Sequence, residues 1–134
     1  MFGKKKRQTA VIVSAPSSTL LSNITTRGSK PQAINDLEKE FFISLEEHLH
    51  LAGLSVEYFA AERMGSGSIR LNCLAGIIGT VHLRKKFGSI QYFTSPLDAH
   101  DMQDAPLEAI LAVIPYWVEY AEGCIHLHSA ATTV

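Results

Sequence analysis

Four segments rich in β-branched and aromatic residues follow one another closely in the middle of the chain. Only short, glycine-containing pieces separate them, and strands joined by such short connections pair antiparallel with their neighbours in sequence. The sequence therefore predicts a four-stranded antiparallel meander, with its strands inside residues 54–64, 68–74, 77–86 and 89–94.

Side-chain alternation predicts the register of this meander, because successive residues of a strand point to opposite faces. A three-residue loop at 74–76, with Gly76 in the left-handed conformation, gives the first hairpin a consistent buried face. A two-residue turn at 87–88 closes the next hairpin and places Ile90 opposite Lys85. The residues predicted to share the buried face are Ile69, Leu71, Cys73, Ile77, Val81 and Leu83.

An amphipathic helix is predicted before the meander, because apolar side chains recur at helical spacing from Ile34 to Ala52. Ser29 and Gln32 have the spacing of a capping box at its start. Gly53 supplies a left-handed cap at its end. We therefore expect a helix that begins at Ser29 and stops at Gly53.

A second helix is predicted after a polar loop at 95–105. Asp104 is a suitable N-cap, and Pro106 suits the first helical turn. Pro115 lies opposite the apolar stripe, where it predicts a kink. The stripe itself consists of Leu107, Ile110, Leu111, Ile114, Trp117, Val118 and Ala121.

Because each helix has one strong apolar stripe, we expect both to pack on one face of the sheet. The predicted fold class is α+β, in the order helix, four-stranded antiparallel meander, helix. The predicted boundaries are a flexible basic arm at 1–28, a core domain at 29–123, and a tail at 124–134 with the pattern of a short edge strand.

The opposite face of the predicted sheet is polar and basic, and it is the expected binding surface. The guanidinium groups of Arg70 and Arg84 suit paired contacts with a carboxylate or phosphate. We therefore expect a non-enzymatic binding or regulatory module that takes a partner protein or a small anionic ligand, with a merely solvated face as the alternative. The expected binding residues are Arg70, Asn72, Thr80, His82, Arg84 and Gln91.

The uneven charge of the chain supports an alternative function in nucleic-acid association. All six charged residues among the first 30 are basic, whereas the rest of the chain holds six bases and all thirteen acids. A net charge of +6 thus precedes one of −7. Basic arms of this kind contact nucleic acid or anionic surfaces, and the residues that would do so are Lys4, Lys5, Lys6 and Arg7.

A second alternative is a metal-dependent enzyme. In an extended tail, Cys124, His126 and His128 would share one face and offer ligands that zinc accepts. Their spacing matches no common zinc motif, so no metal or other cofactor is expected. The helical pair His48 and His50 points roughly 200° apart and cannot chelate one ion.

A homodimer is expected because the last helix carries a second apolar stripe beside the first. Its predicted interface residues are Val113, Tyr116 and Tyr120. No segment approaches the ~20 apolar residues that span a bilayer, so no membrane partner is expected. Two cysteines do not make a disulfide framework, which favours a cytoplasmic location.

Overall fold

A six-stranded sheet forms the centre of the domain, and its strands lie side by side in chain order. The computed structural model describes residues 18–27, 32–74 and 76–132, with side chains as far as Leu127. The strands are β1 (Thr25–Thr26), β2 (Phe59–Arg63), β3 (Ile69–Cys73), β4 (Gly76–His82), β5 (Phe87–Ser95) and β6 (Asp98–Pro106). Because β1 pairs parallel with β2 and all other neighbours pair antiparallel, the sheet is mixed. The predicted α+β class is confirmed, but the prediction of only four antiparallel strands is wrong.

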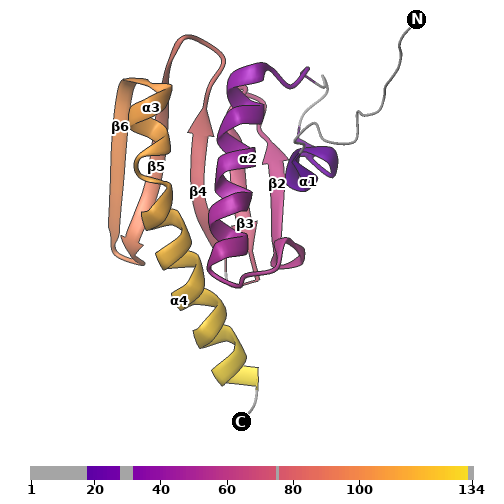
Figure 1. Ribbon diagram of the computed structural model, residues 1–134, viewed down its shortest axis with the longest axis vertical. Helices are drawn as coiled ribbons and strands as arrows, with labels where there is room; N and C mark the ends of the chain where they lie inside the picture. Colours follow the sequence, from indigo (N-terminus) through magenta and orange to yellow (C-terminus); the bar gives the residue numbers. More distant parts are fainter. Residues whose placement is uncertain (1–17, 28–31, 75, 133–134) are drawn as a thin grey trace, which may run out of the picture.

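The main helices lie together on one face of the sheet, as Figure 1 shows, with α2 and α4 side by side and α1 next to β2. In the described part of the chain, the opposite face carries no helix. The prediction that both helices share one face is therefore confirmed. The helical segments are α1 (Thr19–Ser22), α2 (Asp36–Leu51), the 3-10 turn η1 (Val56–Tyr58), α3 (Leu107–Leu111) and α4 (Ile114–Thr132).

Helix α2 begins later than predicted because a complete capping box lies at Asn35 and Glu38. The Asn35 side chain accepts a hydrogen bond from the Glu38 backbone at 2.8 Å, and the Glu38 carboxylate accepts one from the Asn35 backbone at 3.0 Å. Gln32 is not helical, so the predicted start at Ser29, which lies outside the described residues, is wrong. The predicted end is confirmed, since Gly53 has a φ of 78° directly after the helix.

A β-bulge at Ile78 changes the predicted register of the first hairpin. Leu71 pairs with Gly79 while Asn72 pairs with Ile77, which leaves Ile78 as the extra residue. Ile78 is consequently 1% exposed and Ile77 is 45% exposed, so the predicted burial of Ile77 is wrong. After the bulge, the side chains of β4 lie on the faces that were predicted for them, and Val81 and Leu83 are buried as expected.

The second hairpin has a longer loop than the predicted two-residue turn. Ile90 lies opposite Val81 instead of Lys85, a displacement of four residues. The predicted turn residues at 87–88 belong to β5. Because an even displacement keeps every side chain on its own face, the predicted polar and apolar faces of β4 and β5 remain valid.

Strand β6 occupies the segment that was predicted to be a loop, and it forms one edge of the sheet. Its residues are mostly exposed, with Ala105 buried and Met102 half-buried. Asp104 lies within this strand at a φ of 50° and caps no helix, because α3 follows Pro106 without a side-chain cap. The N-cap prediction is therefore wrong.

The last helix is interrupted where a kink was predicted. Helix α3 stops at Leu111, and α4 starts at Ile114, just before Pro115. Proline has no backbone N–H to donate, and its ring clashes with the preceding turn of a continuous helix. Helix α4 then runs on to Thr132, so the predicted edge strand at 124–134 is wrong.

The N-terminal boundary of the folded domain also differs from the prediction. Helix α1 buries Leu20 and Leu21 in the core, and Ser18 caps it. The carboxylate of Glu46 on α2 accepts hydrogen bonds from the Ser18 hydroxyl and from the Thr19 backbone. The folded domain therefore includes residues 18–27, which were predicted to belong to a flexible arm. Residues 1–17 lie outside the described part of the chain.

The core lies between the helices and the sheet, and Trp117 occupies its centre. The Trp117 ring packs so closely on Gly79 that a Cβ atom there would lie 2.7 Å from it. Phe41 on α2 meets the same ring edge-on, with ring centroids 5.4 Å apart. Glycine in β4 thus lets the tryptophan of α4 approach the sheet backbone, and this contact fixes the position of the helix pair.

One ion pair is buried within this layer. Arg63 of β2 and Glu38 of α2 are each 1% exposed, and an Arg63 guanidinium nitrogen donates to Glu38 over 3.0 Å. Arg63 also donates to the carbonyl oxygens of Gly67 at 2.9 Å and Ala33 at 3.3 Å. The pair therefore ties β2 to the start of α2 and to the turn that precedes β3.

Candidate functional site

The candidate site is the helix-free face, which we define by the side chains of Arg70, Asn72, Thr80, His82, Gln91 and Asp101. Strand pairing aligns Arg70 with Thr80, Thr80 with Gln91, and Gln91 with Asp101. These four side chains form one row across β3, β4, β5 and β6, because directly paired residues of neighbouring strands point to the same face. Five of the six predicted binding residues therefore lie on this face.

A shallow depression of about 230 Å³ lies in this face. It is lined by Ser68, Thr80, His82, Ser89, Ile90, Gln91, Asp101 and Gln103. The Ser68 hydroxyl lies 3.1 Å from Nδ1 of His82, which links the start of β3 to the end of β4. The depression offers hydroxyl, amide, imidazole and carboxylate groups, a set that forms hydrogen bonds with polar partners.

Sequence reasoning missed four polar residues of the depression. Asp101 and Gln103 were placed in a loop, whereas β6 adds them to the sheet. Ser68 and Ser89 are the first residues of two predicted strand segments and were not assigned to a face. A signal for the first pair existed in the alternation of Ala99, Asp101 and Gln103 with their neighbours, but these side chains are polar or small on both faces.

Arg70 is engaged within the domain and is not a free cation. It donates to Glu62 of β2 over 2.7 Å, and Arg27 donates to the same carboxylate over 3.1 Å. The hydrogen bond from Arg70 lowers the pKa of Glu62, and the positive charge of Arg27 adds to the effect. This acid was not foreseen on the face, and it balances the charge of Arg70.

Arg84 departs from the predicted face because it lies in the loop after β4. Its guanidinium donates to the carbonyl oxygen of Ala33 over 2.7 Å and lies 3.3 Å from Glu38. Arg84 therefore binds to residues at the N-terminal end of α2. Without Arg84, and with Arg70 paired, the helix-free face is polar and nearly charge-balanced, where a basic face was predicted.

The cysteine and histidine cluster does not have the predicted extended geometry. Cys124 and His126 lie two residues apart on α4, so they point roughly 200° apart. The side chain of His128 lies outside the described residues. Within the described part of the chain, no group of three acidic, histidine or cysteine side chains converges as a metal site would require.

Burial raises the pKa of the Cys124 thiol, and the nearby Cys73 thiol adds to the increase, although a hydrogen bond with Tyr120 opposes it. Burial likewise raises the pKa of the Tyr120 hydroxyl. A thiol held in its protonated form is a poor metal ligand and a poor nucleophile. The raised pKa therefore favours the protonated form of the Cys124 thiol.

The predicted dimer stripe is partly covered by its own chain. Tyr116 stacks on Tyr92 with ring centroids 5.7 Å apart, and Tyr120 stacks on Phe93 at 5.6 Å. Val113 is half-buried. These contacts with β5 cover part of the apolar surface of the second stripe within the same chain. A homodimer through Val113, Tyr116 and Tyr120 therefore stays a prediction.

The chain has no significant match among protein-family models, curated proteins or solved structures. Across the described residues, the helices are all too short or too polar to cross a bilayer. The predicted nucleic-acid residues Lys4, Lys5, Lys6 and Arg7 lie outside the described part of the chain.

Proposed function

We propose that the chain is a non-enzymatic binding module whose helix-free face binds a polar surface of a partner protein. The observation that carries this proposal is the row of Arg70, Thr80, Gln91 and Asp101 across four adjacent strands. A row of polar groups held by a paired sheet is already ordered before binding. Such a surface loses little conformational entropy when a partner binds.

The size of the depression favours a protein partner over a small ligand. Small-molecule sites usually enclose about 300–1,000 Å³, and the depression is smaller, at about 230 Å³. Its residues Thr80, Gln91 and Asp101 belong to the face opposite the helices. Figure 1 shows the main helices of the described chain on the other face. A broad, shallow surface of this kind fits the exposed face of another protein better than it encloses a metabolite.

Charge balance refines the chemistry of the proposed partner. Glu62 pairs with both Arg70 and Arg27, and Asp101 adds a further negative charge at the other end of the row. A small anionic ligand would gain little from an arginine that is already paired. The favoured partner therefore presents hydroxyl and amide groups.

The test compares the partners captured by the folded full-length protein and by a variant with Gln91→Lys, which adds one positive charge at the centre of the row. We expect cross-linked partner protein, quantified by mass spectrometry, to fall at least about tenfold, since about 1.4 kcal/mol lost at one contact changes an equilibrium tenfold. A Gln103→Ala variant, which only truncates a side chain lining the depression, should give a smaller loss.

The matched control is Glu40→Gln on the exposed side of α2, because it changes the net charge by the same amount. This variant should capture partners as the original protein does. Unchanged capture by Gln91→Lys, with circular dichroism confirming its fold, would contradict the proposal. Equal loss in both variants would point to net charge as the cause and would also contradict it.

A further inference from the structure

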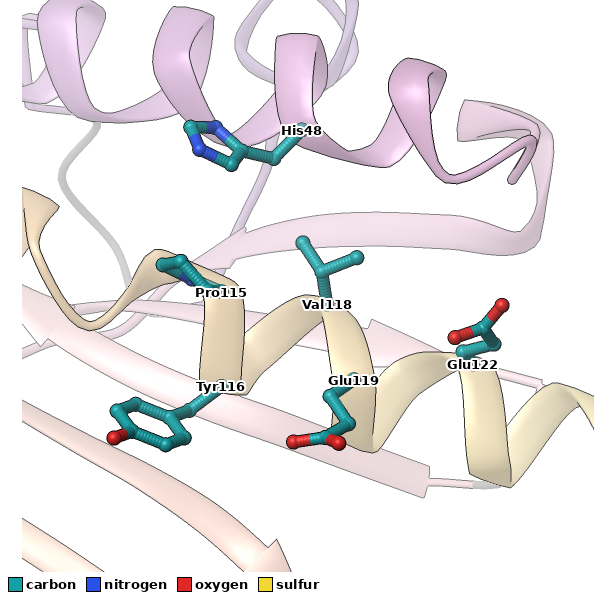
Figure 2. Close-up of a pocket in the computed structure, with 6 residues that line it drawn as sticks. All are labelled: His48, Pro115, Tyr116, Val118, Glu119 and Glu122. Atoms are coloured by element: carbon teal, nitrogen blue, oxygen red, sulfur yellow. The ribbon is translucent and has the colours of Figure 1, made fainter.

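A second hollow, the α2–α4 groove, lies on the helical side of the domain and has a volume of about 510 Å³. Figure 2 shows His48 on α2 facing Pro115, Val118 and Glu122 of α4, whereas Tyr116 and Glu119 project from the side of α4 away from α2. The lining residues are His48, Pro115, Tyr116, Val118, Glu119 and Glu122. The groove therefore combines an apolar wall with two carboxylates.

The polar groups of the groove favour a cation. The ion pairs formed among the described residues use only Glu38 and Glu62 as acids, so neither Glu119 nor Glu122 has a basic partner there. His48 lies across the groove, and its Nδ1 is 2.8 Å from the carbonyl oxygen of Ser44, to which it donates. Long basic side chains suit such a groove, because their methylene stems pack on apolar groups while their charged ends reach carboxylates.

We propose that this groove is occupied by the basic segment Lys4–Arg7 of the same chain. The segment carries four positive charges in four residues, whereas residues 31–134 carry a net charge of −7. In the groove, the lysine or arginine stems would lie along Pro115 and Val118, and the charged ends would lie against Glu119 and Glu122. This occupancy is independent of the helix-free face, which lies on the other side of the sheet.

The place where the described chain begins makes this contact reachable. Ser18 is held against α2 by Glu46, and His48 of the groove lies two residues further along the same helix. These two α2 residues point roughly 200° apart, so the segment has to cross one helix, whose diameter is about 10–12 Å. The 11 residue steps from Arg7 to Ser18 span up to about 36 Å when extended. The connection is therefore several times longer than the crossing requires.

The crossing route is itself acidic. Glu47 and Glu40 are exposed on α2, and they attract a basic chain on its way to the groove. Because every partner in this contact is close to solvent, salt should weaken it strongly. The contact would hold the basic segment on the protein at low salt and release it at high salt.

The experiment is zero-length carbodiimide cross-linking of the full chain, which joins a lysine amine to a carboxylate only when the two touch. We expect cross-linked peptides that join Lys4, Lys5 or Lys6 to Glu119 or Glu122. Raising the salt from about 0.05 M to about 0.5 M shortens the Debye length roughly threefold and should lower their yield at least about fivefold. In a mixture of ¹⁴N- and ¹⁵N-labelled protein, the cross-linked peptides should carry a single isotope.

Two paired variants test the position of the contact. Glu119→Gln with Glu122→Gln should abolish the groove cross-links and leave any links to α2 unchanged. Glu40→Gln with Glu47→Gln removes the same charge from the outer side of α2 and should leave the groove cross-links in place. Links that favour Glu40 and Glu47 over the groove, an absence of groove links, or mixed-isotope links that identify a second copy as the occupant would each overturn the proposal.

Discussion

Replacement of Arg63 by methionine removes one partner of the buried ion pair and leaves the side-chain volume nearly unchanged. Glu38 is 1% exposed, so its carboxylate would remain in a nonpolar layer without its main partner. Breaking one side of a buried pair usually costs about 3–5 kcal/mol of unfolding free energy. Arg84 lies 3.3 Å from the same carboxylate and still offsets part of its charge. We therefore expect the free energy of unfolding to fall by about 3 kcal/mol, the low end of this range.

The measurement is urea unfolding followed by circular dichroism, with Arg70→Met as the comparison. Arg70 and Glu62 are 23% and 18% exposed, so their pair should contribute less than about 1 kcal/mol. Adding Glu38→Gln to Arg63→Met removes the stranded charge and should recover part of the loss. If Arg63→Met is no more destabilising than Arg70→Met, the reasoning from burial is wrong.

Three further changes test other parts of the domain. Gly79→Ala places a Cβ atom 2.7 Å from the Trp117 ring and should lower the free energy of unfolding by about 1–3 kcal/mol in urea, whereas Gly65→Ala, with no atom nearby, should not. Asn35→Ala removes the side-chain half of the capping box and should lower the free energy of unfolding by about 1 kcal/mol in the same assay. An unchanged urea midpoint would contradict this. Burial raises the pKa of Cys124 above its ordinary value of 9.0, so the folded state keeps a proton that the unfolded state releases. Stability should therefore fall as the pH rises above about 9 and less so in Cys124→Ala; equal pH profiles for the two proteins would refute this.

Periodic apolar patterns made the helices predictable from the sequence. The stripe that includes Phe41, Leu45 and Leu49 is buried as predicted. Residues about 3.6 positions apart always lie on the same face of a helix, so the apolar face can be read from the sequence alone. The end at Gly53 was also predictable, since a positive φ favours glycine. The start was not, because Ser29 and Asn35 both offer plausible caps and only one can precede the first turn.

The sheet was less predictable because its irregularities leave weak local signals. The bulge at Ile78 adds one residue to β4, and nothing in the local sequence marks its position. The edge strand β6 is mostly exposed, so its sequence lacks the alternation of apolar and polar residues that identifies a strand. The helix-free face was nevertheless located through Thr80, His82 and Gln91, since the error in pairing was an even number of residues. Asp101 was missed along with its strand.

The contact of Phe41 with Trp117 joins two helices from opposite ends of the domain. Each strand from β3 to β6 can pair with the one made just before it, so the sheet can grow as the chain emerges from the ribosome. The Trp117 partner of Phe41 is made much later, because at roughly 5–20 residues per second several seconds pass before α4 is synthesised. Until α4 is made, the core residues that Trp117 covers stay exposed, and exposed apolar surface of this kind makes a chain prone to aggregate.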